Sequence, residues 1–317
     1  MEDVLGVIEQ TINKSTIDDF RKYISSLTGH TKWMICSDYC IDDKSKPNDT
    51  ATFTVLPYYS DILDIQQNIA KHAPTDIKNT RSVTDEFINY QKSGLIFHFS
   101  VIFERKPNHV LGHYTKDFMR LALINTIEML NKLVVNTPPN KEYFEKVIVK
   151  ANNLLQKMDK KSFNVKLLKQ MLIINLLASY IAYIISRETK VTNIAWFSDR
   201  DAILDSYQNI VVDLFGMNHH GLCERDKIDD SKIGIFVGKP DNKENENKMW
   251  YDELIRLPDF ITGTLSDYNF VENLVSKSKF NSMIEGCIAD NNNISILKLF
   301  FDSGLLKCSR ITVASND

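Results

Sequence analysis

The chain has 317 residues, 43% of them hydrophobic, so it is long enough to bury the core of one large domain or of two ordinary ones. Its 38 basic and 41 acidic residues leave a formal net charge of -3, which excludes the overall positive charge typical of nucleic-acid-binding proteins. A nucleic-acid partner would therefore need a local basic groove. The five cysteines form no CxxC pair, which indicates reduced thiols and predicts a cytoplasmic protein.

Two segments bear on membranes. The N-terminal MEDVLGVIEQ has neither a basic region nor a continuous apolar run, so we expect no signal peptide. The most apolar run, residues 171–185, contains Asn175 and Ser179 and is shorter than the ~20 residues that span a bilayer. We interpret it as a core helix and predict no membrane partner.

The first third of the chain predicts helices followed by strands. Residues 1–30 predict a helical N-terminal extension of two short amphipathic helices. Three strand candidates follow, each rich in β-branched and aromatic residues. Residues 60–93, between the second and the third, are expected to be a mostly polar helical segment. The three candidates are KWMICSDYCI, TATFTVLPY and GLIFHFSVIFE.

The remainder alternates between helices and strands. Within residues 113–187 apolar side chains recur at spacings of three and four, which predicts three consecutive helices. A fourth strand, NIAWFS, precedes a helix that we expect to end at Gly216, and KIGIFVG predicts a fifth strand. Helices are expected from Met249 onward, and residues 276–317 are interpreted as a C-terminal helical segment with SRITVAS as a candidate last strand.

This order of elements resembles the RNase H-like fold, the superfamily that includes retroviral integrases and Holliday-junction resolvases. The resemblance covers residues 31–275, with a helical insertion at about 113–187, and implies an α/β fold with a mixed sheet flanked by helices. It also implies that KWMICSDYCI and NIAWFS are adjacent strands of one sheet. In that fold the first strand carries an Asp, the fourth ends in an acid, and the last helix presents an acid near its start. The acids at these three places are Asp38, Asp199 and Asp259.

The resemblance implies metal-dependent cleavage of DNA or RNA, with these three acids as catalytic ligands of Mg²⁺ or Mn²⁺. Two ions ~4 Å apart must contact both the attacking and the leaving oxygen, so the carboxylates have to converge from different elements. Asp201 or Asp117 would be a fourth ligand. Many members of the superfamily place a Glu in the first long helix, where this chain offers Asp117 and Glu128 as candidates.

Simpler structural roles would also explain these carboxylates. Asp259 follows Pro258, which suits the first turn of a helix, where an acid interacts favourably with the helix dipole. Asp199 and Asp201 could cap the next helix, and Asp201 is the better placed of the two. Asp38 would have no role if strand alternation placed it on a solvent-exposed face.

Other functions remain open. IAWFSDRDAIL is an apolar strand followed by DxD, which resembles phosphatases and phosphotransferases of the haloacid dehalogenase family, with Asp199 as nucleophile and Asp201 as general acid. The same DxD could chelate a metal–nucleotide in a glycosyltransferase, although no sugar-nucleotide fold pattern precedes it.

A non-catalytic scaffold that binds a protein partner is a further alternative, since fold does not imply function. In NHHGLC, residues 218–223, the side chains of His219, His220 and Cys223 could bind zinc, but a second ligand cluster is missing, and we expect a loop there.

Overall fold

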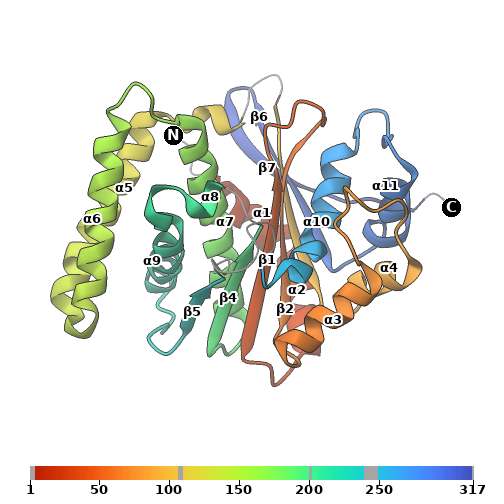
Figure 1. The fold of residues 1–317 in the computed structure, drawn as a ribbon, viewed down its shortest axis with the longest axis horizontal. Coiled ribbons are helices and arrows are strands. Elements are labelled where there is room, and N and C mark those ends of the chain that lie inside the picture. Colours follow the sequence, from red (N-terminus) through yellow and green to blue (C-terminus); the bar gives the residue numbers. More distant parts are fainter. Residues whose placement is uncertain (1–3, 106–109, 200–201, 239–248, 316–317) are drawn as a thin grey trace. The chain divides into compact units, whose positions relative to one another are not determined.

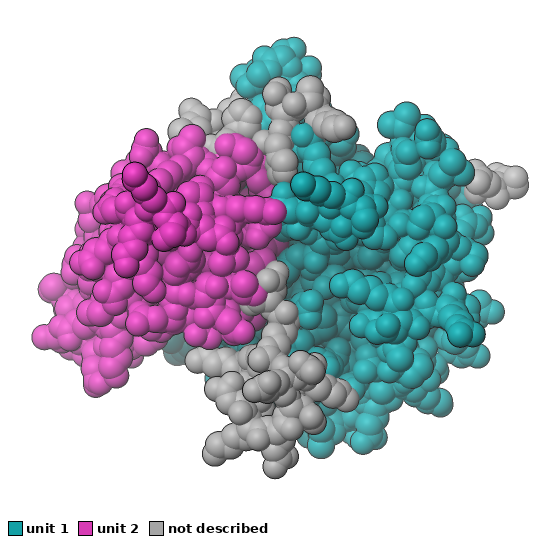
Figure 2. Space-filling view, turned by 45° about the horizontal axis from the view of Figure 1, so that its top comes forward, with its two compact units in different colours: residues 1–110, 184–199, 229–317 teal, residues 111–183, 200–228 magenta. Residues whose placement is uncertain are grey.

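The computed structural model describes residues 4–105, 110–199, 202–238 and 249–315. Two compact units make up the chain, and Figure 2 colours them teal and magenta. Unit 1 comprises residues 1–110, 184–199 and 229–317, and unit 2 comprises residues 111–183 and 200–228. All the strands found among the described residues belong to unit 1, so this unit carries the candidate catalytic acids.

A seven-stranded mixed sheet forms the centre of unit 1, in the order β5-β4-β1-β2-β3-β6-β7 (Figure 1). β1 pairs with β2 in antiparallel and with β4 in parallel orientation, and β4 pairs in parallel with β5. The prediction of an α/β fold in which KWMICSDYCI and NIAWFS are adjacent strands is therefore confirmed. The strands are β1 (Lys32–Cys40), β2 (Asp49–Pro57), β3 (Phe97–Phe103), β4 (Asn193–Ser198), β5 (Gly234–Val237), β6 (Ile294–Asp302) and β7 (Leu305–Ile311).

The C-terminal end of the chain differs from the expectation. Residues 276–317 contain one short helix, α11 (Ser278–Met283), but they also contribute β6 and β7 to the sheet, so the segment is not purely helical. The candidate last strand SRITVAS overlaps the end of β7. β6 pairs in parallel with β3, so the sheet also extends beyond residue 275. The turn between β6 and β7 consists of Ser303 and Gly304, with φ values of 52° and 82°. Two successive residues with positive φ match the right-handed twist of paired strands and produce a tight hairpin.

Helices cover both faces of the sheet. On one face Phe20 of α2 lies against Phe97 and Phe99 of β3, with ring centroids 5.1 and 5.3 Å apart. On the other face α10 packs in a hydrophobic cluster with Met34 and Cys36 of β1. The helices expected within residues 1–30 and 60–93 are confirmed. The helices of unit 1 are α1 (Val4–Ser15), α2 (Ile17–Ser26), α3 (Ile62–His72), α4 (Asp85–Gln91), α10 (Asp252–Asp267) and α11 (Ser278–Met283).

Helix α10 begins at Asp252, in agreement with the helices expected from Met249 onward. Its buried residues Leu254, Leu257 and Ile261 recur at helical spacing and pack in the same hydrophobic cluster as Met34 and Cys36 of β1. Pro258 lies inside the helix rather than in its first turn, so the expectation about its position is wrong. Gly263 makes room for the connection between α3 and α4, because a Cβ there would lie 2.7 Å from Cγ2 of Ile77.

Unit 2 is built from helices, and the three consecutive ones expected within residues 113–187 are confirmed. The helix expected to end at Gly216 is different. Positive φ values at Tyr207, Gln208 and Asn209 interrupt it, and its second part continues to Arg225. The helices in this part of the chain are α5 (Lys116–Asn136), α6 (Lys141–Met158), α7 (Val165–Glu188), α8 (Ala202–Asp205) and α9 (Ile210–Arg225).

The residues proposed for zinc lie in α9 and not in a loop. His219 and Cys223 are one helical turn apart and buried, with Nε2 and Sγ 3.5 Å from each other. Residues four positions apart lie on the same face of a helix, which accounts for this contact.

Two predictions concern the environment of the chain. All five cysteines are free thiols, as predicted. By length and composition, helix α7 would suit a membrane span, with a mean hydropathy of 1.6 over its most apolar window, of which 78% is buried in the structure. Core helices have the same properties, so the absence of a membrane partner stays a prediction.

Candidate active site

Asp38 lies on the face of the sheet that α10 covers. Side chains of a strand alternate between the faces, and Asp38 follows Met34 and Cys36 at intervals of two. The residue is 7% exposed, and the hydroxyl of Thr262 in α10 donates to its main-chain oxygen at 3.2 Å. The side chain is therefore not on a solvent-exposed face, and the simplest explanation for this carboxylate is excluded.

Asp199 lies beside Asp38 because β1 and β4 run in parallel. Ser37 is paired with Ser198 in the ladder, and the N–H of Asp199 donates to the main-chain oxygen of Ser37 at 2.9 Å. Alternation from Phe197, which packs in the cluster under α10, puts Asp199 on the same face as Asp38. Both acids thus lie at the carboxyl ends of adjacent parallel strands, the edge at which α/β sheets commonly bind ligands.

Helix α10 supplies two further acids, Asp252 and Asp259. They are seven residues apart, about two turns, and therefore share one side of the helix. Oδ2 of Asp259 accepts a hydrogen bond from the N–H of Ile77 at 2.7 Å. Asp259 lies too far inside α10 to interact with the helix dipole, which acts within the first turn. That role falls to Asp252 and Glu253.

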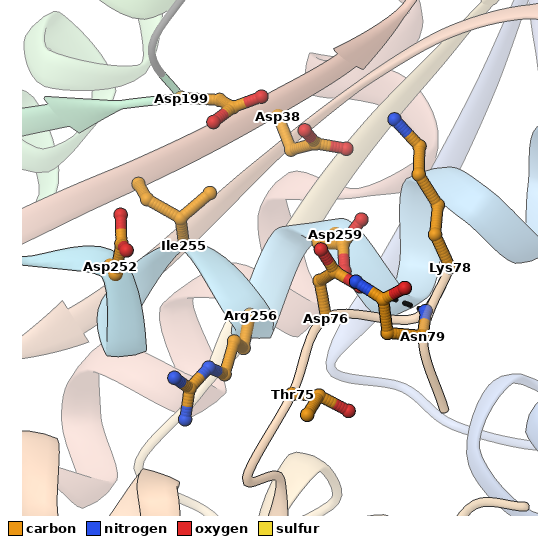
Figure 3. Close-up of a pocket in the computed structure, with 10 residues that line it drawn as sticks. All are labelled: Asp38, Thr75, Asp76, Lys78, Asn79, Asp199, Asp252, Ile255, Arg256 and Asp259. Carbon is orange, nitrogen blue, oxygen red and sulfur yellow. Dashed lines mark hydrogen bonds between the residues drawn. The ribbon is translucent and has the colours of Figure 1, made fainter. Parts of the chain in front are cut away.

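The three predicted acids line one open cavity of about 370 Å³ (Figure 3). The carboxylates of Asp38 and Asp199 lie next to each other and face α10, which carries Asp259. The structure therefore brings together acids that are far apart in the sequence. The other residues that line the cavity are Thr75, Asp76, Lys78, Asn79, Asp252, Ile255 and Arg256.

Two acids of this cavity, Asp38 and Asp259, resist ionisation. Burial raises the pKa of Asp38 well above its ordinary value, and the negative charges of Asp259 and Asp199 raise it further. Burial also raises the pKa of Asp259 to about 7, with contributions from Asp76 and Asp199 that exceed what Lys78 offsets. Carboxyl groups that are buried together in this way favour either bound protons or a bound cation.

The residues of the cavity fit hard divalent cations better than any softer metal. Carboxylate oxygens are the ligands that Mg²⁺ and Mn²⁺ prefer, whereas zinc sites usually contain Cys or His. The three predicted acids come from two adjacent strands and a helix, and Asp38 and Asp199 lie next to each other. Two ions need several carboxylates, and Asp76 and Asp252 add a fourth and a fifth acid to the same cavity.

The remaining sequence candidates are Asp201, Asp117 and Glu128. Asp201 lies outside the described residues, so its role as cap, ligand or general acid stays a prediction. Asp117 and Glu128 are exposed residues of α5 in unit 2, and neither lines the cavity.

Sequence reasoning missed Asp252 and Lys78. Asp252 was overlooked because Pro258 was assigned to the first turn of a helix, although the seven-residue spacing to Asp259 was a usable signal. Lys78 comes from the connection between α3 and α4, where no periodic pattern points to a site.

Comparisons of the chain with models of protein families, with curated proteins and with solved structures found no match. Function therefore has to be inferred from the cavity itself.

Proposed function

We propose that this chain is a metal-dependent nuclease that cleaves phosphodiester bonds of DNA or RNA. Asp38, Asp199 and Asp259 would be the ligands of Mg²⁺ or Mn²⁺. One observation carries the proposal: a buried Asp on a central strand faces two other acids, from a second strand and a helix, in a cavity open to solvent. Buried like charges cost free energy in the folded protein, and a divalent cation would offset that cost.

The sheet supports an RNase H-like fold within this proposal. Three antiparallel strands, β1 to β3, are followed in the sheet by β4 and β5, which add in parallel on the other side of β1. This arrangement agrees with the order of elements in the sequence and puts the first and fourth strands side by side. β6, β7 and the helices of unit 2 would be additions to that core.

Bound ions would activate a water molecule and polarise the phosphate, which is the chemistry that metal ions supply in phosphodiester hydrolysis. The contribution of the chain is to hold the ligands in place before the ions arrive. Asp38 and Asp199 are fixed by the pairing of β1 with β4, and Asp259 is fixed by α10 and by its hydrogen bond from Ile77. Rigid placement of this kind reduces the reorganisation that the reaction requires.

The proposal is tested by calorimetric titration with Mg²⁺ and Mn²⁺ and by cleavage of labelled DNA and RNA. Asp38→Asn, Asp199→Asn and Asp259→Asn should each abolish cleavage and weaken ion binding while the protein stays folded. Asp302→Asn is the matched control, because Asp302 is an exposed acid of β6 that pairs with Lys307 outside the cavity. If the wild-type chain binds neither ion, or if the three variants cleave as well as the control, the proposal is wrong.

The alternatives give different results in the same assays. A scaffold that binds a protein partner would retain its function in all three Asn variants and would cleave nothing. A DxD phosphatase has one point in its favour, since Asp199 directly follows a buried strand. It would hydrolyse p-nitrophenyl phosphate, and it would depend on Asp199 and Asp201 but not on Asp38. The position of Asp38 beside Asp199 favours the nuclease, because the phosphatase mechanism gives Asp38 no role.

A further inference from the structure

One wall of the cavity is a tight turn between α3 and α4, formed by residues 75–80. Its own hydrogen bonds define it: the N–H of Asn79 donates to Oδ1 of Asp76 at 2.9 Å, and the N–H of Thr80 donates to the main-chain oxygen of Asp76 at 3.1 Å. Four residues of this turn line the cavity, although no other part of the connection does so. The turn is therefore part of the same site as the carboxylates.

Helix α10 holds this turn and the chain just before it at three points. Asp259 accepts the N–H of Ile77, and Nη1 of Arg256 donates to the main-chain oxygen of Ala73 at 2.6 Å. The side chain of Ile77 is 2% exposed and fills the space left by Gly263. The helix that carries the acid thus also fixes the turn that faces it.

A buried lysine of α11 is the fourth anchor. Lys279 is only 5% exposed, and its ammonium donates to the main-chain oxygens of Ile77 and of Thr80, the latter at 2.9 Å. The oxygen of Lys78 is a third, weaker acceptor at 3.4 Å. An ammonium has three donors, and removing it from water is costly unless they are satisfied. Here a single turn provides all three acceptors, so Lys279 and the turn depend on each other.

The turn held in this way extends the side chain of Lys78 toward the carboxylates (Figure 3). Lys78 is exposed and, among the described residues, makes no ion pair. Arg256, the other cation among the described residues that line the cavity, is already engaged by Ala73 and by Glu253, whose Oε1 is 3.3 Å away. A lysine whose only task was to neutralise the acids would be expected to pair with one of them.

We propose that Lys78 binds the anionic phosphate of the substrate beside the metal-binding carboxylates, and that Lys279 is a positioning residue that holds the turn carrying Lys78. The proposal rests on the proposed function and adds a substrate-binding group to the same cavity. A lysine ammonium is a compact charge that binds phosphate oxygens without demanding one geometry, which suits a nucleic-acid backbone.

The test compares Lys78→Met with Lys71→Met, an exposed lysine at the end of α3 that does not line the cavity. Fluorescein-labelled single-stranded DNA, duplex DNA and single-stranded RNA of mixed sequence serve as probes, with Ca²⁺ replacing Mg²⁺ to suppress cleavage. Fluorescence anisotropy at a series of KCl concentrations gives affinity and salt dependence. Loss of one phosphate contact should weaken binding of the preferred probe about tenfold and reduce the slope of log affinity against log salt by about 1.

The outcomes separate this inference from the proposed function. Calorimetry should show that Lys78→Met binds Mg²⁺ as tightly as wild type or more tightly, because a positive charge near the ions has been removed. If Lys78→Met binds every probe like Lys71→Met, with the same salt slope, while Mg²⁺ binding is intact, the assignment of Lys78 is overturned and the metal site stands. If wild type binds neither Mg²⁺ nor any probe, the proposed function fails and this inference with it.

The role of Lys279 is tested by a double-mutant cycle. Lys279→Met should raise KM for the preferred probe with a smaller effect on kcat, and it should weaken binding little further in a chain that already carries Lys78→Met, since both changes remove the same contact. Lys277→Met, at an exposed neighbouring lysine, is the control. Lys279→Gln, which retains a donor, replaces Lys279→Met if that variant does not fold. Additive losses in the cycle would show that Lys279 acts independently of Lys78 and would overturn the positioning role.

Discussion

Replacing Asp259 with Asn should stabilise the metal-free protein at pH 8, in contrast to most changes of a partly buried residue. The pKa of Asp259 is raised from its ordinary 3.8 to about 7, chiefly by burial. Between these two values the folded chain keeps a proton that the unfolded chain has lost, so the free energy of unfolding falls as pH rises from about 4 to about 7. Asn cannot ionise and removes this loss, yet its side-chain oxygen can still accept the N–H of Ile77.

The magnitude follows from the two pKa values. A difference of about 3 units corresponds to about 4 kcal/mol, and we expect about 2 kcal/mol because Asp259 is partly exposed and solvent screens its charge. Urea unfolding in EDTA at pH 5, 6, 7 and 8 measures the effect. The stability of Asp259→Asn relative to wild type should increase from pH 5 to about pH 7 and then level off, and below about pH 4 the wild type should lose this pH dependence as well.

A second acid of the same helix provides the control. Asp267 is also buried, but hydrogen bonds from Lys46 and Ser276 outweigh burial and lower its pKa. Its charged form therefore stabilises the fold above its ordinary pKa, and Asp267→Asn should destabilise the protein at pH 7 and pH 8. If Asp259→Asn behaved like Asp267→Asn, the conclusion that the cavity raises the pKa of Asp259 would be refuted.

Three further outcomes are expected. Mg²⁺ should raise the Tm of wild type but not of Asp38→Asn. The affinity of wild type for Mg²⁺ should increase as pH rises through about 7, because the carboxyl groups have to lose their protons before they bind the ion. Calorimetry over this pH range measures both effects. Gly263→Ala should lower the free energy of unfolding by about 1–3 kcal/mol in urea, since its Cβ would lie 2.7 Å from Ile77; an unchanged value would mean that the turn moves freely. Asp199→Asn should weaken ion binding with little loss of stability, whereas Asp201→Ala should cost about 1 kcal/mol of stability as a lost cap does. The reverse result would favour the DxD phosphatase.

The central strands and the three acids could be predicted because their signals are local. β1 and β4 are runs of apolar and β-branched residues, and an Asp at the end of such a run is conspicuous in the sequence. The position of Pro258 inside α10 could not be predicted, because a proline is more common in the first turn of a helix than in its interior. Tertiary packing of the apolar side of the helix outweighs the lost hydrogen bond, and no local pattern shows this.

The last two strands and the turn at residues 75–80 depend on distant partners. β6 forms because β3 offers it an edge, and the two strands are separated in sequence by most of the chain. Similarly, the turn is held by Asp259 and Lys279, which lie far along the chain. The hairpin at Ser303 and Gly304 was a readable signal, since a flexible Gly between two alternating segments is typical of such turns.

The hydrogen bond from Ile77 to Asp259 links the order of the turn to the charge of the cavity. An ionised carboxylate accepts an N–H more strongly than a neutral one, so an ion that keeps Asp259 charged also tightens the turn. Thermodynamic reciprocity then requires an ordered turn to raise the affinity for the ion by the same factor. Because the same turn carries Lys78, cation and phosphate would bind cooperatively even without touching each other, and the protection of the Ile77 amide from hydrogen exchange would report their coupling.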